Sequence, residues 1–280
     1  MIRPALALLA AVLLLGAAPS SRPAHRALDD QAVRALLVEV QQLPSLEQRI
    51  PLISSRLHGA PYAFSPLGEG RGQPPDEDPR FRVDRFDCTT FVETVVALSL
   101  AHDLDEARVL LDHLRYQDGK VSFATRKHFP EAQWIPLNIH DGFFTDITRQ
   151  VGGDRVVIAR KRLDSEVWAH RRTKILNELD PAQIPSGTFE LPVIPPLAAR
   201  QVLDRIPDGT VVSIVREDFK SIPIRVSHQG LLVRKKGVLV LRHAMPKGID
   251  RVIDENFDSY LARIGQYGKW PVTGIHLLQP

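Results

Sequence analysis

Apolar residues recur at the spacing of α-helices through the first part of the chain. Each apolar series follows a residue that can cap a helix, and the four predicted helices cover about 29–40, 45–57, 87–98 and 104–114. The third series is apolar on almost every side, which is typical of a buried central helix. Residues 59–80 are rich in glycine and proline, so we expect a long loop before that helix.

The pattern changes after Asp118-Gly119, where short stretches of β-forming residues replace the helical spacing. Strands are predicted at 121–124, 142–148, 155–159, 210–215, 225–233, 238–243 and 272–278, and helices around 168–179 and 256–264. Helices that precede antiparallel strands indicate an α+β fold, with the helices packed on one side of a sheet. Because the composition shows no break, we expect a lead and helix at 21–44 and then one domain over 45–280, with an insertion around 116–150.

The N-terminus has the pattern of a secretory signal peptide. Arg3 gives a positive start, residues 5–15 are apolar without interruption, and small residues at 16–20 offer a cleavage zone, so we expect a signal peptide at 1–20. The apolar run is too short to span a bilayer comfortably. The sequence therefore predicts a soluble exported protein, periplasmic or otherwise secreted, that is not inserted in the membrane after cleavage. An uncleaved membrane anchor is the alternative.

Composition and charge narrow the classes of partner. The 280 residues are 44% hydrophobic and 25% charged, as in an ordinary globular domain. The formal net charge is +3, and the basic residues are scattered rather than clustered, which does not indicate nucleic-acid binding. A mildly basic surface suits an anionic polymer.

Cys88 is the only cysteine of the chain and lies where the third helix is predicted to begin. It cannot form a disulfide within the chain. A thiol in the first turn of a helix faces unpaired backbone N–H groups, which favour the thiolate, the nucleophilic form of cysteine. Asp87, directly before it, is a candidate cap for that helix. These features indicate a nucleophilic cysteine.

Among ten histidines, His228 and His243 are placed to assist such a nucleophile. His228 lies near the start of one predicted strand, His243 ends the next, and a turn at Lys235-Lys236-Gly237 joins the two strands. Two of three plausible registers put both rings on one face: directly opposite for a Lys235-Lys236 loop, and one diagonal step apart for a Lys236-Gly237 loop. This is the arrangement of a general base and a residue that orients it. The alternative is a pair of half-buried strand histidines bonded to backbone.

The motifs around these residues resemble those of a known family. The cysteine motif is Phe86-Asp87-Cys88-Thr89-Thr90-Phe91-Val92-Glu93-Thr94, and the histidine motif is Val226-Ser227-His228-Gln229-Gly230. Together they resemble the NlpC-type cysteine peptidases, which are papain-like peptidoglycan hydrolases. Within that group the chain is most similar to a family once known only as a domain of unknown function and described as N-acetylmuramoyl-L-alanine amidase-like. Further segments extend the resemblance over most of 45–280: Gly59-Ala60-Pro61-Tyr62, Tyr116-Gln117-Asp118-Gly119, Arg126-Lys127-His128-Phe129 and Leu241-Arg242-His243-Ala244.

The resemblance implies a papain-like, NlpC-type fold, in which a cysteine at a helix start packs on an antiparallel sheet that carries the histidines. It implies that Cys88 is the nucleophile, His228 the general base and His243 the orienting residue. Further residues are implied at the substrate: Tyr62, Asp87, Thr89, Arg126, His128 and Trp134. For Asp87, Thr89 and the insertion residues the alternative is a structural role, as helix-cap, ion-pair or core residues.

By resemblance, the activity is hydrolysis of the amide bond between N-acetylmuramic acid and L-alanine in peptidoglycan fragments. The reaction would pass through a thioester acyl-enzyme and use no metal or other cofactor. An endopeptidase that cuts between D-glutamate and a diamino acid of the stem peptide is one alternative, and a module that binds muropeptides without catalysis is another. A zinc amidase is a further alternative, although the chain has no His-Glu-x-x-His run.

Overall fold

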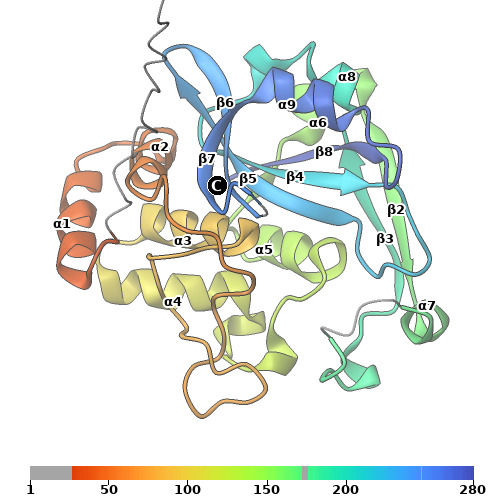
Figure 1. Ribbon diagram of the computed structural model, residues 1–280, viewed down its shortest axis with the longest axis horizontal. Helices are drawn as coiled ribbons and strands as arrows, with labels where there is room; N and C mark the ends of the chain where they lie inside the picture. Colours follow the sequence, from red (N-terminus) through yellow and green to blue (C-terminus); the bar gives the residue numbers. More distant parts are fainter. Residues whose placement is uncertain (1–26, 172–175, 247) are drawn as a thin grey trace, which may run out of the picture.

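The computed structural model describes residues 27–171, 176–246 and 248–280 (Figure 1). The predicted signal peptide at 1–20 lies outside these residues, and so does part of the helix predicted around 168–179. No helix in the described part of the chain is long and apolar enough to cross a bilayer.

Four helices form the N-terminal layer, as the apolar spacing predicts. They are α1 (Asp30–Val40), α2 (Leu46–Arg56), α3 (Cys88–Leu100) and α4 (Leu104–Arg115). Helix α3 packs against both α2 and α4. Every residue from 90 to 99 is buried, so the prediction of a buried central helix is confirmed.

A six-stranded antiparallel sheet lies against this layer (Figure 1). Its strands are β1 (Thr145–Asp146), β4 (Thr210–Arg216), β5 (Val226–Lys235), β6 (Val238–Met245), β7 (Arg251–Asn256) and β8 (Val272–Gln279), in the order β1-β8-β4-β5-β6-β7. The strands predicted at 210–215, 225–233, 238–243 and 272–278 are confirmed. The predicted α+β class is confirmed with them.

Helices cover both faces of this sheet, so the expectation that they pack on one side is wrong. Leu231 of β5 faces the N-terminal helices, whereas its neighbour Leu232 belongs to the apolar cluster on the opposite face. That cluster includes residues in or beside α6 (Thr148–Gly152), α8 (Pro196–Ala199) and α9 (Phe257–Ile264). In Figure 1 these three short helices lie above the sheet, α3 and α4 lie below it, and α1 and α2 lie to its left. The central strands are therefore apolar on both faces.

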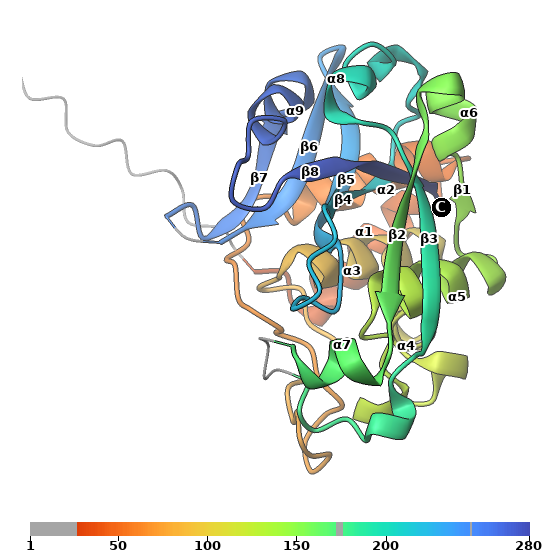
Figure 2. The same ribbon diagram turned by 90° about the vertical axis from the view of Figure 1, so that its right-hand side faces the viewer.

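A second, two-stranded sheet extends away from the main one (Figure 2). It pairs β2 (Val157–Leu163) with β3 (Gly187–Val193), and α7 (Ser165–Ala169) lies between them in the chain. The sequence pattern located only the start of β2, at 155–159, and missed β3. Strand β3 begins with a glycine and contains Pro192, residue types that are rare in strands.

Other strand predictions fail for local reasons. Residues 121–124 form no strand, because the Ser122 hydroxyl caps a 3-10 turn (η2, Phe123–Thr125) in their place. The strand predicted at 142–148 is reduced to the two residues of β1. The pattern also missed β7, which carries three charged side chains among six residues and so lacks a clear apolar alternation.

The helices of the second half agree with the pattern only in part. The helix predicted at 256–264 is confirmed as α9. Around 168–179, α7 ends at Ala169, and residues 176–179 form a turn. The insertion holds a π-helix (η3, Pro130–Trp134) and α5 (Ile135–His140), neither of which was predicted.

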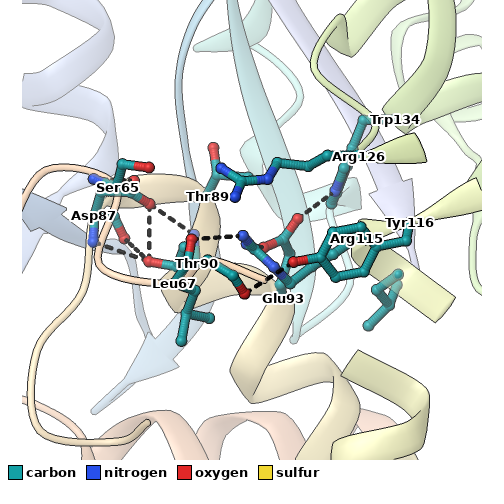
Figure 3. Close-up of polar contacts among 12 residues, drawn as sticks. Ser65, Leu67, Asp87, Thr89, Thr90, Glu93, Arg115, Tyr116, Arg126 and Trp134 are labelled. Atoms are coloured by element: carbon teal, nitrogen blue, oxygen red, sulfur yellow. Dashed lines mark hydrogen bonds and ion pairs between the residues drawn. The ribbon is translucent and has the colours of Figure 1, made fainter. Parts of the chain in front are cut away.

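A buried ion pair ties the centre of α3 to the elements around it. Glu93 of α3 accepts a hydrogen bond from Arg115 of α4 at 2.5 Å and one from the indole N–H of Trp134 at 2.8 Å (Figure 3). Arg115 also donates to the carbonyl oxygen of Leu67, in the loop before α3, at 3.0 Å. The pair therefore fixes α3 relative to α4, the insertion and that loop.

We expect Arg115→Met to lower the free energy of unfolding by about 3–5 kcal/mol, because the Glu93 carboxylate stays buried without its partner. The double variant Glu93→Leu/Arg115→Met should recover only part of this loss, because the buried N–H of Trp134 then lacks its acceptor. Urea unfolding followed by circular dichroism measures both. Arg160→Met, which removes an exposed ion pair with Glu190, is the control. If Arg115→Met lowers the free energy of unfolding as little as Arg160→Met does, the prediction is contradicted.

Candidate active site

Cys88 occupies the first position of α3, as the sequence predicts. Asp87 is the N-cap: its carboxylate accepts the Thr90 N–H at 2.8 Å, and the Thr90 hydroxyl accepts the Asp87 N–H at 3.0 Å. The other carboxylate oxygen accepts the Ser65 N–H at 3.0 Å (Figure 3). Asp87 thus fixes the first turn of α3 and the loop before it, which is the position of a structural cap.

The β5–β6 hairpin brings the two candidate histidines together. Lys235 pairs with Val238 across a Lys236-Gly237 loop, one of the two registers expected to place both rings on one face. The Nε2 atom of His228 lies 2.6 Å from Nδ1 of His243, and the rings meet edge to face with 4.9 Å between centroids. The predicted geometry of the two rings is therefore present.

Gly230 permits this contact. A Cβ atom at this position would lie 3.0 Å from Cβ of His243 and 3.0 Å from the carbonyl oxygen of Arg242. A larger residue would push β6 away from β5 and separate His243 from His228. The glycine is therefore required by the close approach of the two strands.

Cys88 meets β5 at the residue that follows His228. The backbone N–H of Gln229 lies near the sulfur of Cys88 and acts to lower its pKa, and the side-chain oxygen of Gln229 accepts the Thr89 hydroxyl at 3.0 Å. The amide nitrogen of Gln229 donates in turn to Ser213 of β4 at 3.1 Å. Thr89 therefore joins the start of α3 to two strands. The sequence analysis gave Gln229 no role, although its place directly after His228 was an available signal.

Burial raises the pKa of the Cys88 thiol to about 12, and the adjacent Asp87 carboxylate adds to the rise. The backbone N–H groups of Gln229 and Thr89 and the Thr89 hydroxyl oppose this rise without overcoming it. The helix start was expected to favour the thiolate, whereas burial and the neighbouring negative charge act in the opposite direction. The thiol is protonated at neutral pH.

Burial lowers the pKa of His228 to about 3, and the neighbouring His243 and Arg216 act in the same direction. The imidazole is therefore neutral at pH 7 and can accept a proton. Both Cys88 and His228 keep part of their surface accessible. The resting site thus holds a neutral thiol and a neutral imidazole rather than an ion pair.

We expect the rate of Cys88 alkylation by iodoacetamide to rise about tenfold per pH unit from about pH 6 to pH 10. Only the thiolate reacts, and the thiol pKa lies above that range. Since the chain has no other cysteine, the loss of free thiol reports on this residue alone.

N-acetylcysteine is the control for this measurement, and its rate should level off above a pKa of about 8.5. A plateau in the alkylation rate of the protein below about pH 7 would reveal a thiolate–imidazolium pair and contradict the assignment of a neutral thiol.

Tyr62 lies beside the thiol. It pairs with Phe86 in an isolated parallel bridge, just before the cap of α3. Burial raises the pKa of Tyr62 to about 12, and the neighbouring Cys88 and Asp87 add to the rise. The phenol is therefore protonated at neutral pH and can donate a hydrogen bond near the sulfur.

A cavity of about 900 Å³ lies near this site between four segments, one of which holds Leu176 and Glu178. One wall is the loop before α3, with Phe64 and Ser65, and a second is the insertion, with Arg126 and His128. The third is the segment 221–224, which leads into β5. Because Ser65 also binds the cap of α3, the cavity adjoins the helix start.

Arg126 and His128 line this cavity, but their polar groups are bonded to other residues of the protein. Arg126 forms ion pairs with Glu69 at 2.5 Å and with Asp76 at 2.8 Å. The Nε2 atom of His128 lies 2.7 Å from the carbonyl oxygen of Phe123, and burial lowers the pKa of His128 to about 4. Both residues shape the wall, and much of their hydrogen-bonding capacity is used within the protein.

Trp134 lies in the core, so the expectation that it lines the cleft is wrong. Its side chain is buried, and its ring packs on Phe144 with 5.3 Å between centroids. Its N–H is bound by Glu93. The indole of Trp134 therefore packs among the apolar residues around α3, and the buried Glu93 carboxylate accepts its N–H.

The described residues, 27–171, 176–246 and 248–280, contain no group of three or more His, Cys, Asp or Glu side chains close enough to hold a metal ion.

A family model described as N-acetylmuramoyl-L-alanine amidase-like matches residues 52–266. The match includes Cys88, His228 and His243. No curated protein shows a significant match to the chain.

Solved structures share the fold. A protein from Legionella pneumophila is 26% identical with a TM-score of 0.78, and the match covers 89% of this chain and 93% of that one. An N-acetylmuramoyl-L-alanine amidase from Bacteroides uniformis is 22% identical with a TM-score of 0.67, covering 84% and 98%. A putative xylanase from Bacteroides fragilis is 22% identical with a TM-score of 0.64, covering 81% and 99%. At 22% identity the likeness concerns the fold alone.

Proposed function

Since the chain belongs to the N-acetylmuramoyl-L-alanine amidase-like family, we propose that it is an exported cysteine amidase acting on peptidoglycan fragments. The bond cleaved joins N-acetylmuramic acid to L-alanine, as the family description and the name of the Bacteroides uniformis structure suggest. The observation that carries the proposal is the 2.6 Å contact of His228 with His243 on a hairpin whose Gln229 is bonded to the first turn of α3, where Cys88 lies. The same proposal assigns a papain-like, NlpC-type fold, with the nucleophile at a helix start and the base on the sheet.

In the first half of the reaction, His228 takes the thiol proton of Cys88 while the sulfur attacks the amide carbonyl carbon. Because both groups are neutral at rest, this proton transfer accompanies the attack. The backbone N–H of Cys88, at the positive end of α3, donates to the oxyanion. The C–N bond then breaks, His228 gives its proton to the leaving amine of L-alanine, and the lactyl group remains on the sulfur as a thioester.

In the second half, water attacks the thioester carbonyl carbon while His228 takes a proton from that water. The C–S bond breaks, and the proton returns to the sulfur of Cys88. The products are the carboxylic acid of N-acetylmuramic acid and the stem peptide released earlier. The scheme balances with these two residues and water, and it uses no cofactor.

The cavity beside Ser65 is the proposed substrate site. Its volume of about 900 Å³ suits a ligand of muropeptide size. Its walls combine apolar side chains such as Phe64 with the polar groups of Arg126 and Asp76. The signal-peptide pattern at 1–20 supports export to the compartment that holds peptidoglycan.

We expect Cys88→Ala to abolish cleavage of a purified muropeptide, with a loss in kcat of at least about 10³-fold, because the nucleophile is removed. Cys88→Ser, which keeps a hydrogen-bonding group but not the thiol, should be nearly as inactive. Mass spectrometry of the wild-type reaction should show intact N-acetylmuramic acid and a peptide that begins with L-alanine.

Each other result would count against a specific part of the proposal. Cleavage by Cys88→Ala would refute the nucleophile. A product that retains L-alanine and D-glutamate on the sugar would identify the endopeptidase. Binding of the muropeptide by the wild-type protein without any cleavage would identify a binding module.

We expect Phe64→Ala to raise KM roughly tenfold with a smaller change in kcat, because an apolar contact with the bound substrate is lost. Phe64 lines the cavity and is 66% exposed, so the variant should fold normally. Leu197→Ala, at a residue of α8 that is 69% exposed, is the matched control and should leave KM unchanged. Equal KM values for the two variants would rule out the cavity as the substrate site.

A further inference from the structure

The hydrogen bond between the two histidines determines where His243 keeps its proton. If His228 accepts the thiol proton on Nδ1, its other nitrogen, Nε2, must already carry a hydrogen. That hydrogen points to Nδ1 of His243 at 2.6 Å, so Nδ1 must be the acceptor. Neutral His243 therefore carries its own proton on Nε2.

The Nε2 atom of His243 is buried and has no hydrogen-bond partner among the described residues. Glu255 of β7 lies nearby, with its Oε2 atom 3.6 Å from this nitrogen, slightly beyond hydrogen-bond length. A buried N–H without an acceptor is destabilising, because it has lost its hydrogen bond to water. A small rotation of Glu255 that closes this gap is therefore favourable.

Arg263 of α9 holds the other oxygen of Glu255. Its guanidinium donates to Oε1 at 2.6 Å, which leaves Oε2 for His243. The neighbouring His243 and Arg263 lower the pKa of Glu255 against the effect of burial, so the carboxylate is ionised at neutral pH. Tyr260 packs edge-on against the His243 ring at 5.7 Å between centroids, and Arg263 lies over the Tyr260 ring at 5.0 Å.

We propose that Glu255 is a positioning residue that accepts the Nε2–H of His243 and thereby fixes the tautomers of both histidines. With His243 held in this tautomer, His228 keeps its free Nδ1 lone pair for the thiol proton of Cys88. This inference rests on the proposed function, because it takes His228 as the base. Glu255 also counters the positive charge that develops on His228 when the thiol proton is transferred.

Glu255→Gln tests the proposal, because an amide has only one acceptor atom. If the amide oxygen stays on Arg263, the NH₂ group faces Nε2 of His243, which must then accept. The His243 proton moves to Nδ1 and opposes the Nε2–H of His228. We expect kcat to fall about 10³- to 10⁴-fold, as when an orienting carboxylate becomes an amide in a Ser-His-Asp triad, with KM little changed.

Nitrogen-15 NMR of histidine-labelled protein reads the tautomer directly in the resting protein. We expect the His243 proton on Nε2 in the wild-type protein and on Nδ1 in Glu255→Gln. The double variant Glu255→Gln/Arg263→Met frees the amide oxygen to turn toward His243. It should restore the Nε2 tautomer and regain at least about tenfold in kcat over the single variant.

Glu190→Gln is the matched control, since it removes an exposed carboxylate that pairs with Arg160 at 2.7 Å, and it should keep the wild-type kcat and tautomer. An unchanged His243 tautomer in Glu255→Gln would overturn the positioning role at any level of activity. The NMR comparison needs no substrate, so it decides the role of Glu255 even if the wild-type protein cleaves no muropeptide. Failure of the proposed function is therefore a separate result.

Discussion

Thr89 donates a hydrogen bond to Gln229 where the first turn of α3 touches β5, and the geometry of the candidate site depends on this contact. Apolar packing orients α3 against the sheet, but the nearly uniform apolar surface of the helix does little to fix its position along its own axis. The polar connection from Thr89 through Gln229 to Ser213 fixes that position relative to the sheet, as the Glu93–Arg115 pair fixes it relative to α4. Since one residue of helix rises about 1.5 Å, a shift of one residue would take the sulfur out of reach of the Gln229 N–H.

Predictions from the sequence succeeded where a local pattern was strong. The spacing of apolar residues located α3, and the turn at Lys235-Lys236-Gly237 left three registers for the hairpin that carries His228 and His243, of which the structure has the Lys236-Gly237 one. Strands β3 and β7 were not predicted. A proline interrupts the apolar alternation of β3, and charged side chains interrupt that of β7. The sequence also did not predict that helices cover the opposite face of the sheet, because the helices on that face are short.

The protonation of the site could not be read from the sequence. A helix start by itself lowers the pKa of a thiol, and this effect alone would predict a thiolate at Cys88. The rise in the pKa of Cys88 results from the packing of atoms around the sulfur and from the cap Asp87, so it exists only in the folded chain. In the same way, the burial of Trp134 depends on Glu93, a partner 41 residues away. Long-range packing therefore decided the pKa of Cys88 and the position of Trp134, which local sequence patterns do not contain.

The protonated state of Cys88 also bears on how the residue survives outside the cell, if the chain is exported as proposed. Peroxides and similar oxidants attack thiolates far faster than thiols, and the sulfinic and sulfonic products are not readily reversed. With its pKa raised to about 12, the thiol presents little of the vulnerable form at neutral pH. The chain has no second cysteine that could rescue an oxidised sulfur by forming a disulfide. Burial at the helix start would then protect the sulfur, because little of the thiolate that oxidants attack is present at neutral pH.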